Sequence, residues 1–357
     1  MAASPTTSPE SILVVRLGAM GDVLHAMPSV AALRRKFPDA KLGWVIERRW
    51  AELLLSGDGA TATVSGNSLV DSLHVVDTLA WRKHLLAGST RHEVGRVLKK
   101  LRSPKYEMAI DIQGAIKSAL IAKLSGVKTV YGFEAPREHL ATMFYQYRIA
   151  TNAAHVVEQN LELCSALARD RLSSGNYDLP RSAQAERWCD RTLGEQGLKR
   201  FAILNPGSGW GAKCWPGERF AEVARRLNVS GIRSVINFGP GEETLSNAVA
   251  KQSENAALPM SCSITELISL TRRAVLFVGG DTGPMHLAAA LKIPVVALFG
   301  PTDPARNGPY GTEALVLRSQ RSVTSYSHVA DADPGLHSIT TDEVITAASR
   351  LLGVSIG

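Results

Sequence analysis

The stretch from Val275 to Pro304 constrains the fold more than any other, because it alternates between two kinds of secondary structure over a short length. It contains two apolar runs, VLFV and PVVALF, separated by a glycine turn and a segment rich in helix formers. Two apolar strands joined by a helix form a parallel βαβ unit, and strands of a parallel sheet read as continuous apolar runs because helices cover both faces. The stretch therefore predicts an α/β fold.

The turn in this stretch is suited to bind an anion. Asp281 and Thr282 are natural N-cap residues, and Pro284 fits the first turn of the helix that follows. The backbone N–H groups of Thr282 and Gly283 then point out of the carboxyl end of the sheet, where a helix N-terminus attracts phosphate. His286 lies one turn further, within reach of the same ligand. Two interpretations are open at this point: a phosphate site, or an ordinary βαβ corner with a capped helix and a surface histidine.

The same alternation of strand and helix runs along the whole chain and divides it into two halves. A length of 357 residues and a hydrophobic fraction of 45% fit two domains with well-filled cores. The polar stretch RDRLSSGNYDLPR, which starts at Arg169, is the candidate linker. We expect an N-terminal domain over residues 11–170, a linker and connecting helix over 171–199, a C-terminal domain over 200–340 and a terminal helix over 341–354.

Charge and cysteine content narrow the function classes. The net charge of +7 favours an anionic partner, such as a phosphosugar, a nucleotide, a membrane surface or a nucleic acid, although moderate basicity also serves solubility alone. Four widely spaced cysteines without a C-x-x-C pair argue against a zinc site or a disulfide framework and fit a reducing cytoplasm. The N-terminus lacks the features of a signal peptide, and no apolar run approaches the ~20 residues that span a bilayer. We expect a soluble cytoplasmic protein, peripheral to a membrane at most.

A loop after the first predicted strand carries a carboxylate. ILVV at residues 12–15 leads into R-L-G-A-M-G-D, which ends at Asp22. This loop has G-x-x-G instead of the G-x-G-x-x-G of dinucleotide-binding folds, although Glu47 lies about where the ribose acid of such folds is expected. Asp22 is either a general base at the carboxyl end of a strand or only a helix N-cap. Pro28 predicts a kink or a short first turn in the helix that follows.

Basic side chains gather in the rest of the first half. Arg82 and Lys83 belong to a basic cluster with a tryptophan, and Lys117 opens a helix after the strand predicted at 108–112. Lys117 is suited to meet an anionic substrate; the alternative is a surface lysine. The segment 91–102 predicts an amphipathic basic helix that covers the sheet or lies against anionic lipid.

Loops of the second half suit a nucleotide. The loop N-P-G-S-G-W-G-A-K offers the Ser208 hydroxyl, backbone N–H donors and the Lys213 cation to phosphates. It is not a Walker A loop, because Ala212 replaces the required glycine, and this argues against a P-loop NTPase. The loop G-P-G-E-E after the next predicted strand carries carboxylates that suit ribose hydroxyls. A D-x-D triplet at residues 331–333 does not follow a strand, so we expect no metal there.

Several of these motifs together resemble one known family. R-L-G-A-M-G-D-V-L-H from Arg16 to His25 resembles the N-terminal signature of the family-9 glycosyltransferases, the lipopolysaccharide heptosyltransferases. D-I-Q-G-A-I-K-S-A from Asp111, and D-T-G-P-M-H-L-A-A-A from Asp281 with G-P-T-D-P after it, are similar to the same family. The similarity runs from about residue 12 to about residue 311, and separated motifs in the right order are specific. Two of the motifs are most similar to heptosyltransferase I, whereas the N-P-G-S-G-W-G-A-K loop is closer to types II and III.

The resemblance implies a GT-B fold, in which two Rossmann-like domains with parallel sheets face a central cleft. It implies an inverting, metal-independent transfer of L-glycero-D-manno-heptose from ADP-heptose to Kdo of the lipopolysaccharide inner core, without a cofactor. The acceptor would be the anionic Kdo-lipid A, bound to the N-terminal domain at the cytoplasmic face of the inner membrane, and no nucleic acid is implied as a partner. The family's terminal helix, here 341–354, often crosses back onto the first domain.

The resemblance also implies roles for single residues. By match, Asp22 is the catalytic base that takes the proton of the acceptor hydroxyl. The donor-binding residues would be Ser208, Gly209, Lys213, Glu243 (or its neighbour Glu242), Asp281, Thr282, Gly283 and His286. The acceptor-binding residues would be Arg82, Lys83 and Lys117, and no residue is expected to bind a metal.

Three alternatives stay open from the sequence. One is a family-9 transferase of type II or III with a different acceptor. The second is an NAD-dependent oxidoreductase on the N-terminal half, which the missing G-x-G-x-x-G disfavours. The third is a nucleotide- or lipopolysaccharide-binding module without catalysis, which the presence of Asp22, Lys213 and His286 disfavours.

Overall fold

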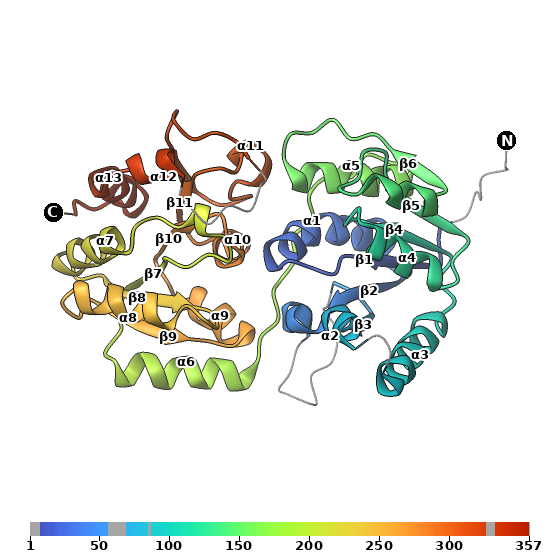
Figure 1. The fold of residues 1–357 in the computed structure, drawn as a ribbon, viewed down its shortest axis with the longest axis horizontal. Helices are drawn as coiled ribbons and strands as arrows, with labels where there is room; N and C mark the ends of the chain where they lie inside the picture. The colour runs from blue at the N-terminus through green and yellow to red at the C-terminus, as the bar shows by residue number, and fades with distance from the viewer. Residues whose placement is uncertain (1–7, 56–68, 85–86, 326–332, 357) are drawn as a thin grey trace. The chain divides into compact units, whose positions relative to one another are not determined.

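The chain divides into two compact units, Met1–Pro180 and Arg181–Gly357, here the N-terminal unit and the C-terminal unit. The computed structural model describes residues 8–55, 69–84, 87–325 and 333–356. Each unit holds one six-stranded sheet (Figure 1). The boundary falls within the stretch expected as linker and connecting helix, 171–199, and helix α6 (Ala183–Glu195) belongs to the C-terminal unit.

The N-terminal unit is built on a parallel sheet. Its strands are β1 (Ser11–Val15), β2 (Lys41–Glu47), β3 (Ser72–Val76), β4 (Met108–Asp111), β5 (Thr129–Phe133) and β6 (Tyr147–Ile149). Its helices are α1 (Met20–Lys36), η1 (Arg48–Leu53), α2 (Thr78–Lys83), α3 (Gly88–Arg102), α4 (Ile116–Leu124), η3 (His139–Phe144) and α5 (Val156–Ala168). The strand order β3-β2-β1-β4-β5-β6 is that of the doubly wound Rossmann fold.

Helices cover both faces of this sheet. Alternate residues of a strand face opposite sides, and four successive residues of β1, from Ile12 to Val15, are all fully buried. Leu13 and Val15 share a hydrophobic core with residues of α3, α4 and η3. Right-handed crossovers place α1 on the other face, where it packs against α5. This two-sided burial explains why β1 reads as an unbroken apolar run.

Helix α1 is continuous through Pro28, so the short first turn predicted as one alternative is wrong. A proline in a helix interior removes one backbone hydrogen bond and crowds the preceding turn, which costs about 3 kcal/mol. Nearly all of α1 from Met20 to Leu33 is buried, and this packing offsets the cost. The Pro28 carbonyl also accepts a hydrogen bond from Gly175 N at 3.0 Å, which fastens the end of the N-terminal unit onto α1.

The C-terminal unit repeats the same architecture. Its strands are β7 (Phe201–Asn205), β8 (Arg233–Phe238), β9 (Ala257–Ser261), β10 (Leu276–Gly280), β11 (Val295–Phe299) and β12 (Ala314–Arg318). Besides α6, its helices are η4 (Gly211–Lys213), α7 (Gly217–Val229), α8 (Glu243–Gln252), α9 (Ile264–Thr271), α10 (Gly283–Ala290), α11 (Pro304–Asn307), α12 (Pro334–Ser338) and α13 (Thr341–Leu352). The order β12-β11-β10-β7-β8-β9 equals that of the N-terminal unit when each unit is counted from its own first strand. The two parallel α/β halves expected from the sequence are confirmed.

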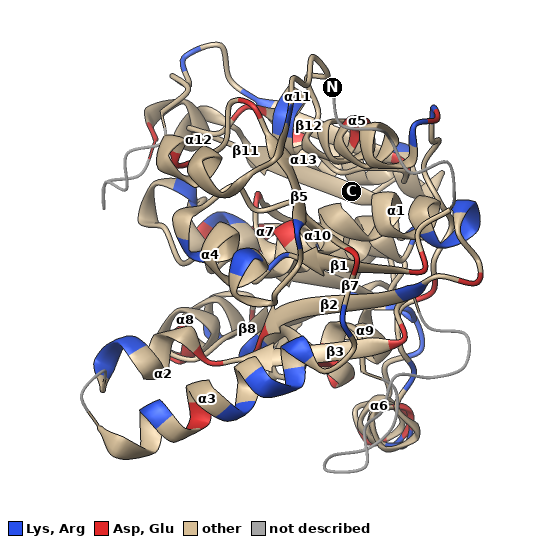
Figure 2. Cartoon of the chain, turned by 90° about the vertical axis from the view of Figure 1, so that its right-hand side faces the viewer, with Lys and Arg blue, Asp and Glu red and all other residues tan. Residues whose placement is uncertain are grey.

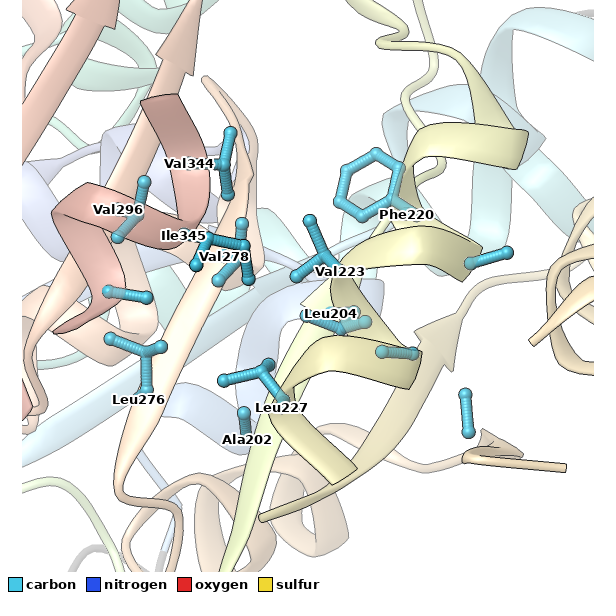
Figure 3. Packing of buried hydrophobic residues seen from close by; sticks show 14 of the residues in the cluster. Ala202, Leu204, Phe220, Val223, Leu227, Leu276, Val278, Val296, Val344 and Ile345 are labelled. Carbon is cyan, nitrogen blue, oxygen red and sulfur yellow. The ribbon is translucent and has the colours of Figure 1, made fainter. Parts of the chain in front are cut away.

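The terminal helix α13 packs in the core of its own unit, and its expected return onto the first domain stays a prediction. Val344 and Ile345 are buried beside Val278 of β10 and Val296 of β11, in the core that also holds α7 (Figure 3). Burying side chains of this size contributes about 1.5–3 kcal/mol each. The apolar stripe of α13 is therefore already used inside the C-terminal unit.

Strands β6, β9 and β12 were not predicted from the sequence. These three strands lie at sheet edges, where one side has no neighbouring strand. Their side chains are only partly buried, as in β6, where Tyr147 and Arg148 are exposed. An edge strand therefore lacks the continuous apolar run by which a central parallel strand is recognised. Across the described residues, none of the helices combines the length and the apolar character needed to cross a membrane.

Candidate functional site

Each sheet has one place where ligands of such folds bind. The strand order changes direction between β1 and β4 in the N-terminal unit and between β7 and β10 in the C-terminal unit. Ligands of open α/β sheets bind outside the carboxyl ends of the strands at such a switch point. The segments that follow these four strands contain Asp22, Lys117, Lys213 and Asp281, all of which the sequence analysis proposed as site residues.

Asp22 lies in the first turn of α1, just after the loop that leaves β1. Its Oδ1 lies 2.7 Å from Nη2 of Arg16, and its Oδ2 accepts a hydrogen bond from Ala19 N at 3.0 Å. The second contact is a capping contact, yet the side chain remains 39% exposed. A carboxylate offers about four acceptor positions, so two contacts leave room for a substrate hydroxyl. The cap and base interpretations of Asp22 are therefore compatible.

Arg16, to which the sequence analysis gave no role, holds Asp22 in place. Its side chain is 9% exposed, and its Nη1 donates to the Ile112 carbonyl at 2.9 Å while Nη2 contacts Asp22. Close by, Leu17 N donates to Oε1 of Gln113 at 2.8 Å. The loops after β1 and β4 are thus joined by two hydrogen bonds, one from a side chain of the first loop and one to a side chain of the second. Arg16 was identifiable only as the first residue of the R-L-G-A-M-G-D loop, and its partner Ile112 is far away in sequence.

A second carboxylate, Asp111 at the end of β4, is fully buried. It accepts hydrogen bonds from the Tyr145 hydroxyl at 2.7 Å and the Ser118 hydroxyl at 2.9 Å, and from two backbone N–H groups, of Gln113 and Gly114. Burial raises the pKa of Asp111 above its ordinary value, and these hydrogen bonds oppose the rise. Because no solvent reaches it, Asp111 shapes the turn that presents Lys117 instead of meeting a substrate.

Lys117 is anchored by a buried acid. Its Nζ lies 3.3 Å from Oε1 of Glu47 and donates to the Thr78 hydroxyl at 2.7 Å. Thr78 also binds Glu47 through its backbone N–H, at 3.1 Å, and through its hydroxyl. Glu47 is therefore engaged by a lysine and a threonine, at the position where a dinucleotide-binding fold would use an acid for ribose. The Lys117 side chain is still 47% exposed, so its ammonium is both fixed and accessible.

Arg82 and Lys83 lie in the last turn of α2 and are exposed. The helix is fixed at its start, where the Asp77 carboxylate accepts Ala80 N at 3.1 Å. Thr78, which binds Lys117, lies one turn before Arg82 on the same helix. The three cations predicted to meet the acceptor therefore stand on adjoining elements at the carboxyl edge of the N-terminal sheet.

In the C-terminal unit, Asp281 joins the two switch-point loops. Its Oδ2 lies 2.7 Å from Nζ of Lys213, which comes from the loop after β7, and its Oδ1 lies 3.0 Å from Nε2 of His286 on α10. Asp281 and His286 are buried, and the Lys213 side chain is 16% exposed. The Lys213 ammonium also lies 5.0 Å from the centre of the Trp210 ring. The Trp210 ring and the buried Asp281 carboxylate together hold the Lys213 ammonium in one position.

The charge of Asp281 is strongly stabilised. Burial alone would raise its pKa, but the hydrogen bond and charge of His286 and the charge of Lys213 outweigh burial and hold the pKa well below its usual range. Asp281 is therefore a permanent anion near neutral pH. It serves to hold Lys213 and His286, and it is unsuited to take a proton from a substrate.

Polar donors of the same unit surround this group. Thr282 is the N-cap of α10 and Gly283 is its first residue, so their N–H groups belong to the helix end that attracts anions. In the loop after β7, the Ser208 hydroxyl accepts a hydrogen bond from Trp210 N at 3.2 Å. Gly209 is exposed, and a Cβ built on it would meet no atom within 4 Å. The loop thus leaves open space beside its donors.

The two glutamates at the start of α8 differ in position. The Glu242 carboxylate accepts Gly239 N at 2.8 Å and lies against Gly207, where an added Cβ would approach it to 2.3 Å. Glu243 is exposed at the first position of the helix. Glu242 is therefore the acid that the fold places against the loop after β7, whereas the residue chosen first from the sequence was Glu243.

The D-x-D triplet is described only in part. Asp331 and Ala332 lie outside the described residues. Asp333 is the N-cap of α12, and its carboxylate accepts Leu336 N at 2.8 Å and the Ser322 hydroxyl at 2.7 Å.

Comparison with known proteins identifies the family. The model of "Glycosyltransferase family 9 (heptosyltransferase)" matches residues 94–334. Lipopolysaccharide heptosyltransferase 1 of Pseudomonas aeruginosa is 30% identical over 86% of this chain and 83% of its own length, and the Escherichia coli K12 enzyme of that name is 30% identical over 87% and 94%. A solved E. coli heptosyltransferase with ADP has a TM-score of 0.74 and 26% identity and covers 96% of this chain and 99% of its own. These heptosyltransferase structures have the GT-B fold, which accounts for the two Rossmann-like sheets. The chain belongs to glycosyltransferase family 9 and is a glycosyltransferase of the lipopolysaccharide heptosyltransferase group.

Proposed function

We propose that this enzyme is a heptosyltransferase of type I, which moves L-glycero-D-manno-heptose from ADP-heptose to Kdo of the lipopolysaccharide inner core. The observation that carries the proposal is the Lys213–Asp281–His286 group, because it fixes the Lys213 ammonium in the same unit as the N-terminal end of α10, and both attract a diphosphate. Its support from relatives is that the first two matches are named heptosyltransferase 1, and that solved neighbours carry ADP or ADP-2-deoxy-2-fluoro heptose.

The C-terminal unit would bind the donor. Lys213 and the N–H groups of Thr282 and Gly283 would neutralise the diphosphate, with the Ser208 hydroxyl as a further donor. As the bond between the anomeric carbon and the phosphate oxygen breaks, negative charge grows on the leaving ADP. Donors that are already in position stabilise that charge without reorganisation. We propose that this arrangement replaces a metal ion, so transfer continues in EDTA and is not stimulated by Mg²⁺.

The N-terminal unit would bind the acceptor. The acceptor hydroxyl attacks the anomeric carbon from the face opposite the leaving group, and its proton passes to the Asp22 carboxylate. One bond to the anomeric carbon forms as the other breaks, so the configuration is inverted. General-base assistance of this kind accelerates a reaction by roughly 10²- to 10⁴-fold. Arg16 would orient Asp22 for this step through the contact at 2.7 Å.

Recognition of the acceptor would rest on its negative charge. Kdo carries a carboxylate and lipid A carries phosphates, and Lys117, Arg82 and Lys83 present cations on adjoining elements. Arginine suits carboxylates and phosphates because its planar group donates two parallel hydrogen bonds. Because this acceptor is a lipid, the proposal places the enzyme at the cytoplasmic face of the inner membrane, in peripheral contact with it.

A type II or III activity is the second candidate. It is favoured by the similarity to lipopolysaccharide heptosyltransferase 3 of Escherichia coli K12, which is 26% identical over 93% of this chain and 95% of its own length. The two candidates differ in the acceptor, which for types II and III already carries a heptose. The oxidoreductase alternative is set aside, because the chain belongs to a glycosyltransferase family.

The deciding experiment offers the enzyme both acceptors. Purified protein is incubated with ADP-heptose and either deacylated Kdo-lipid A or the same acceptor already carrying one heptose, and the products are weighed by mass spectrometry. ADP-glucose serves as the competing donor. Addition of one heptose to the first acceptor supports type I, addition only to the second supports type II or III, and transfer of glucose alone contradicts both.

A further inference from the structure

One outer layer of the N-terminal unit exposes both cations and large apolar side chains. We call the outer layer the four elements α2, α3, α4 and η3, whose inner faces share one hydrophobic core. Hydrogen bonds join them: Trp81 Nε1 donates to Glu93 at 3.2 Å, and Arg102 Nε donates to the Leu124 carbonyl at 2.8 Å. Ile116 N donates at 2.8 Å to Glu138, the residue that precedes η3. The outer side chains of this layer therefore face the same side of the molecule.

The positive charge of the protein is concentrated in this layer. The segment from Thr78 to Tyr106 contains one acid, Glu93, and eight basic residues: Arg82, Lys83, Arg91, Arg96, Lys99, Lys100, Arg102 and Lys105. All eight are exposed. Their surplus of seven charges equals the net charge of +7 of the whole chain, so the remaining residues balance to zero. Figure 2 shows the Lys and Arg bands along α3 and on α2. The single acid is engaged by Arg48 and Trp81.

Apolar side chains are exposed on the neighbouring part of the layer. Met143 is 73% exposed and Leu140 is 58% exposed, both on η3, and Ile116 and Leu120 on α4 are 37% and 41% exposed. Five of the nine large hydrophobic side chains that are exposed in the described ranges lie on this layer, the fifth being Leu79 of α2. A cluster of such side chains beside a basic helix marks an interaction site rather than chance exposure.

We propose that the outer layer docks on an anionic lipid bilayer, with Leu140 and Met143 at the boundary of the hydrocarbon and the α3 cations on the headgroups. Exposed aliphatic side chains beside a basic helix fit the interface of a bilayer, where both kinds of group are satisfied at once. Single-stranded nucleic acid is a poorer fit, because the aromatic side chains Trp81 and Phe144 are partly buried against the core, which leaves less ring surface for stacking bases.

The inference rests on the proposed function, because a lipid-borne acceptor is what would bring the enzyme to a bilayer. Lys117, proposed to meet the acceptor, directly follows the exposed Ile116 at the start of α4. Docking through the layer would therefore hold the acceptor site at the level of the headgroups. The four residues changed in the test below, Arg96, Lys99, Leu140 and Met143, nevertheless have no part in the proposed transfer, so the two ideas can fail separately.

The test measures binding of the full chain to sedimenting vesicles. Wild type should bind vesicles of phosphatidylcholine with phosphatidylglycerol, should bind phosphatidylcholine alone far less, and should bind more weakly as salt rises. Arg96→Ala/Lys99→Ala should weaken binding roughly 30-fold, since each surface cation contributes a factor of about 5. Leu140→Ser/Met143→Ser should weaken it by at least about tenfold, since it removes apolar burial. Both variants should transfer heptose to the deacylated acceptor at the wild-type rate.

Matched controls come from the C-terminal unit, where Arg187, Arg191 and Val229 are exposed. Arg187→Ala/Arg191→Ala and Val229→Ser should bind vesicles like wild type. Equal binding by every variant, or no dependence on anionic lipid, overturns the inference, as does binding to an oligonucleotide by a protein that ignores vesicles. If wild type transfers heptose to the deacylated acceptor but does not sediment with vesicles, the docking surface is refuted and the proposed function stands. If wild type sediments as expected but does not transfer heptose, the proposed function is refuted and the docking surface stands.

Discussion

The switch points of the two units share a strand order but use opposite arrangements of charge. In the N-terminal unit a nearly buried arginine, Arg16, holds a carboxylate, Asp22, that remains 39% exposed. In the C-terminal unit a buried carboxylate, Asp281, holds a lysine and a histidine. The first arrangement leaves an acid partly exposed, and the second fixes a lysine cation near a helix end. Two sheets of one topology can thus divide a transfer reaction, because chemistry is set by the loops and not by the fold.

The comparison predicts that catalysis and donor binding can be separated by mutation, and Asp22 gives the largest effect. Asp22→Asn keeps the size of the side chain and an oxygen for Ala19 N but removes the base, so transfer should fall roughly 10²- to 10⁴-fold. ADP affinity, measured by calorimetry, should stay unchanged, because the donor group lies in the other unit. Asp39→Asn, at an exposed acid beyond the end of α1, is the control. Substantial transfer by Asp22→Asn would refute the base assignment.

Lys213→Met should have the opposite effect to Asp22→Asn, because it should weaken the binding of ADP. It removes the cation proposed to meet the diphosphate, and a hydrogen bond to a charged group contributes about 1.5–3 kcal/mol, so ADP should bind about 10- to 100-fold more weakly. Lys251→Met, at an exposed lysine of α8, should bind ADP normally. An unchanged dissociation constant for Lys213→Met would mean that Lys213 only neutralises Asp281. Melting temperatures of both variants separate that structural role from binding.

The two units should also lose folding stability over different ranges of acidic pH. Burial, with a smaller contribution from the charge of Lys100, lowers the pKa of His74 in β3 to about 4 from 6.5. Because the folded-state pKa is depressed, this stabilisation is complete above pH 6.5 and is lost as pH falls through 4, by about 3 kcal/mol in all. Asp281 also has a depressed pKa, so its contribution is complete above about pH 4 and is lost only below that.

Urea unfolding of wild type and two variants checks these ranges. His74→Asn keeps a group that can bond the Tyr106 hydroxyl, which His74 contacts at 2.8 Å, and its stability should fall less steeply between pH 6.5 and 4. The deficit of Asp281→Asn should be constant over the same range. Parallel curves for wild type and His74→Asn would show that His74 is not the group that titrates.

The smallest effect concerns the ribose. If Glu242 binds the ribose hydroxyls, Glu242→Gln should weaken ADP about tenfold, because a hydrogen bond to a carboxylate becomes one to a neutral amide. Glu243→Gln, at the exposed neighbour, should change affinity less than about twofold. The opposite result would return the role to Glu243, the residue chosen first from the sequence.

The sequence predicted the position of a site residue where that position depends only on the residues next to it in the chain. Asp281 directly follows an apolar strand, and Asp22 and Lys213 lie in the loops that leave two others, so their place at the carboxyl edge could be read locally. The role of Arg16 could not, because it depends on the carbonyl of Ile112 in another loop. Glu242 and Glu243 are chemically identical neighbours, and only the path of the chain into α8 decides which of them meets Gly207. Likewise, the sequence shows that α13 has an apolar stripe but not that this stripe packs on β10 and β11, because that core is formed by residues far apart in the chain.

The joined loops of the N-terminal unit limit how this enzyme can be redesigned. Changing the segment after β1 alone would break the bonds from Arg16 to Ile112 and from Leu17 to Gln113, and a side chain at Gly18 would collide with Trp50, whose Nε1 lies 2.6 Å from the position of an added Cβ. A graft meant to alter acceptor choice therefore has to move the segments after β1, β2 and β4 as one cassette. Chimaeras that take all three segments from one homologue should keep the carboxylate of Asp22 in position. Chimaeras that take a single segment should fold and yet be inactive.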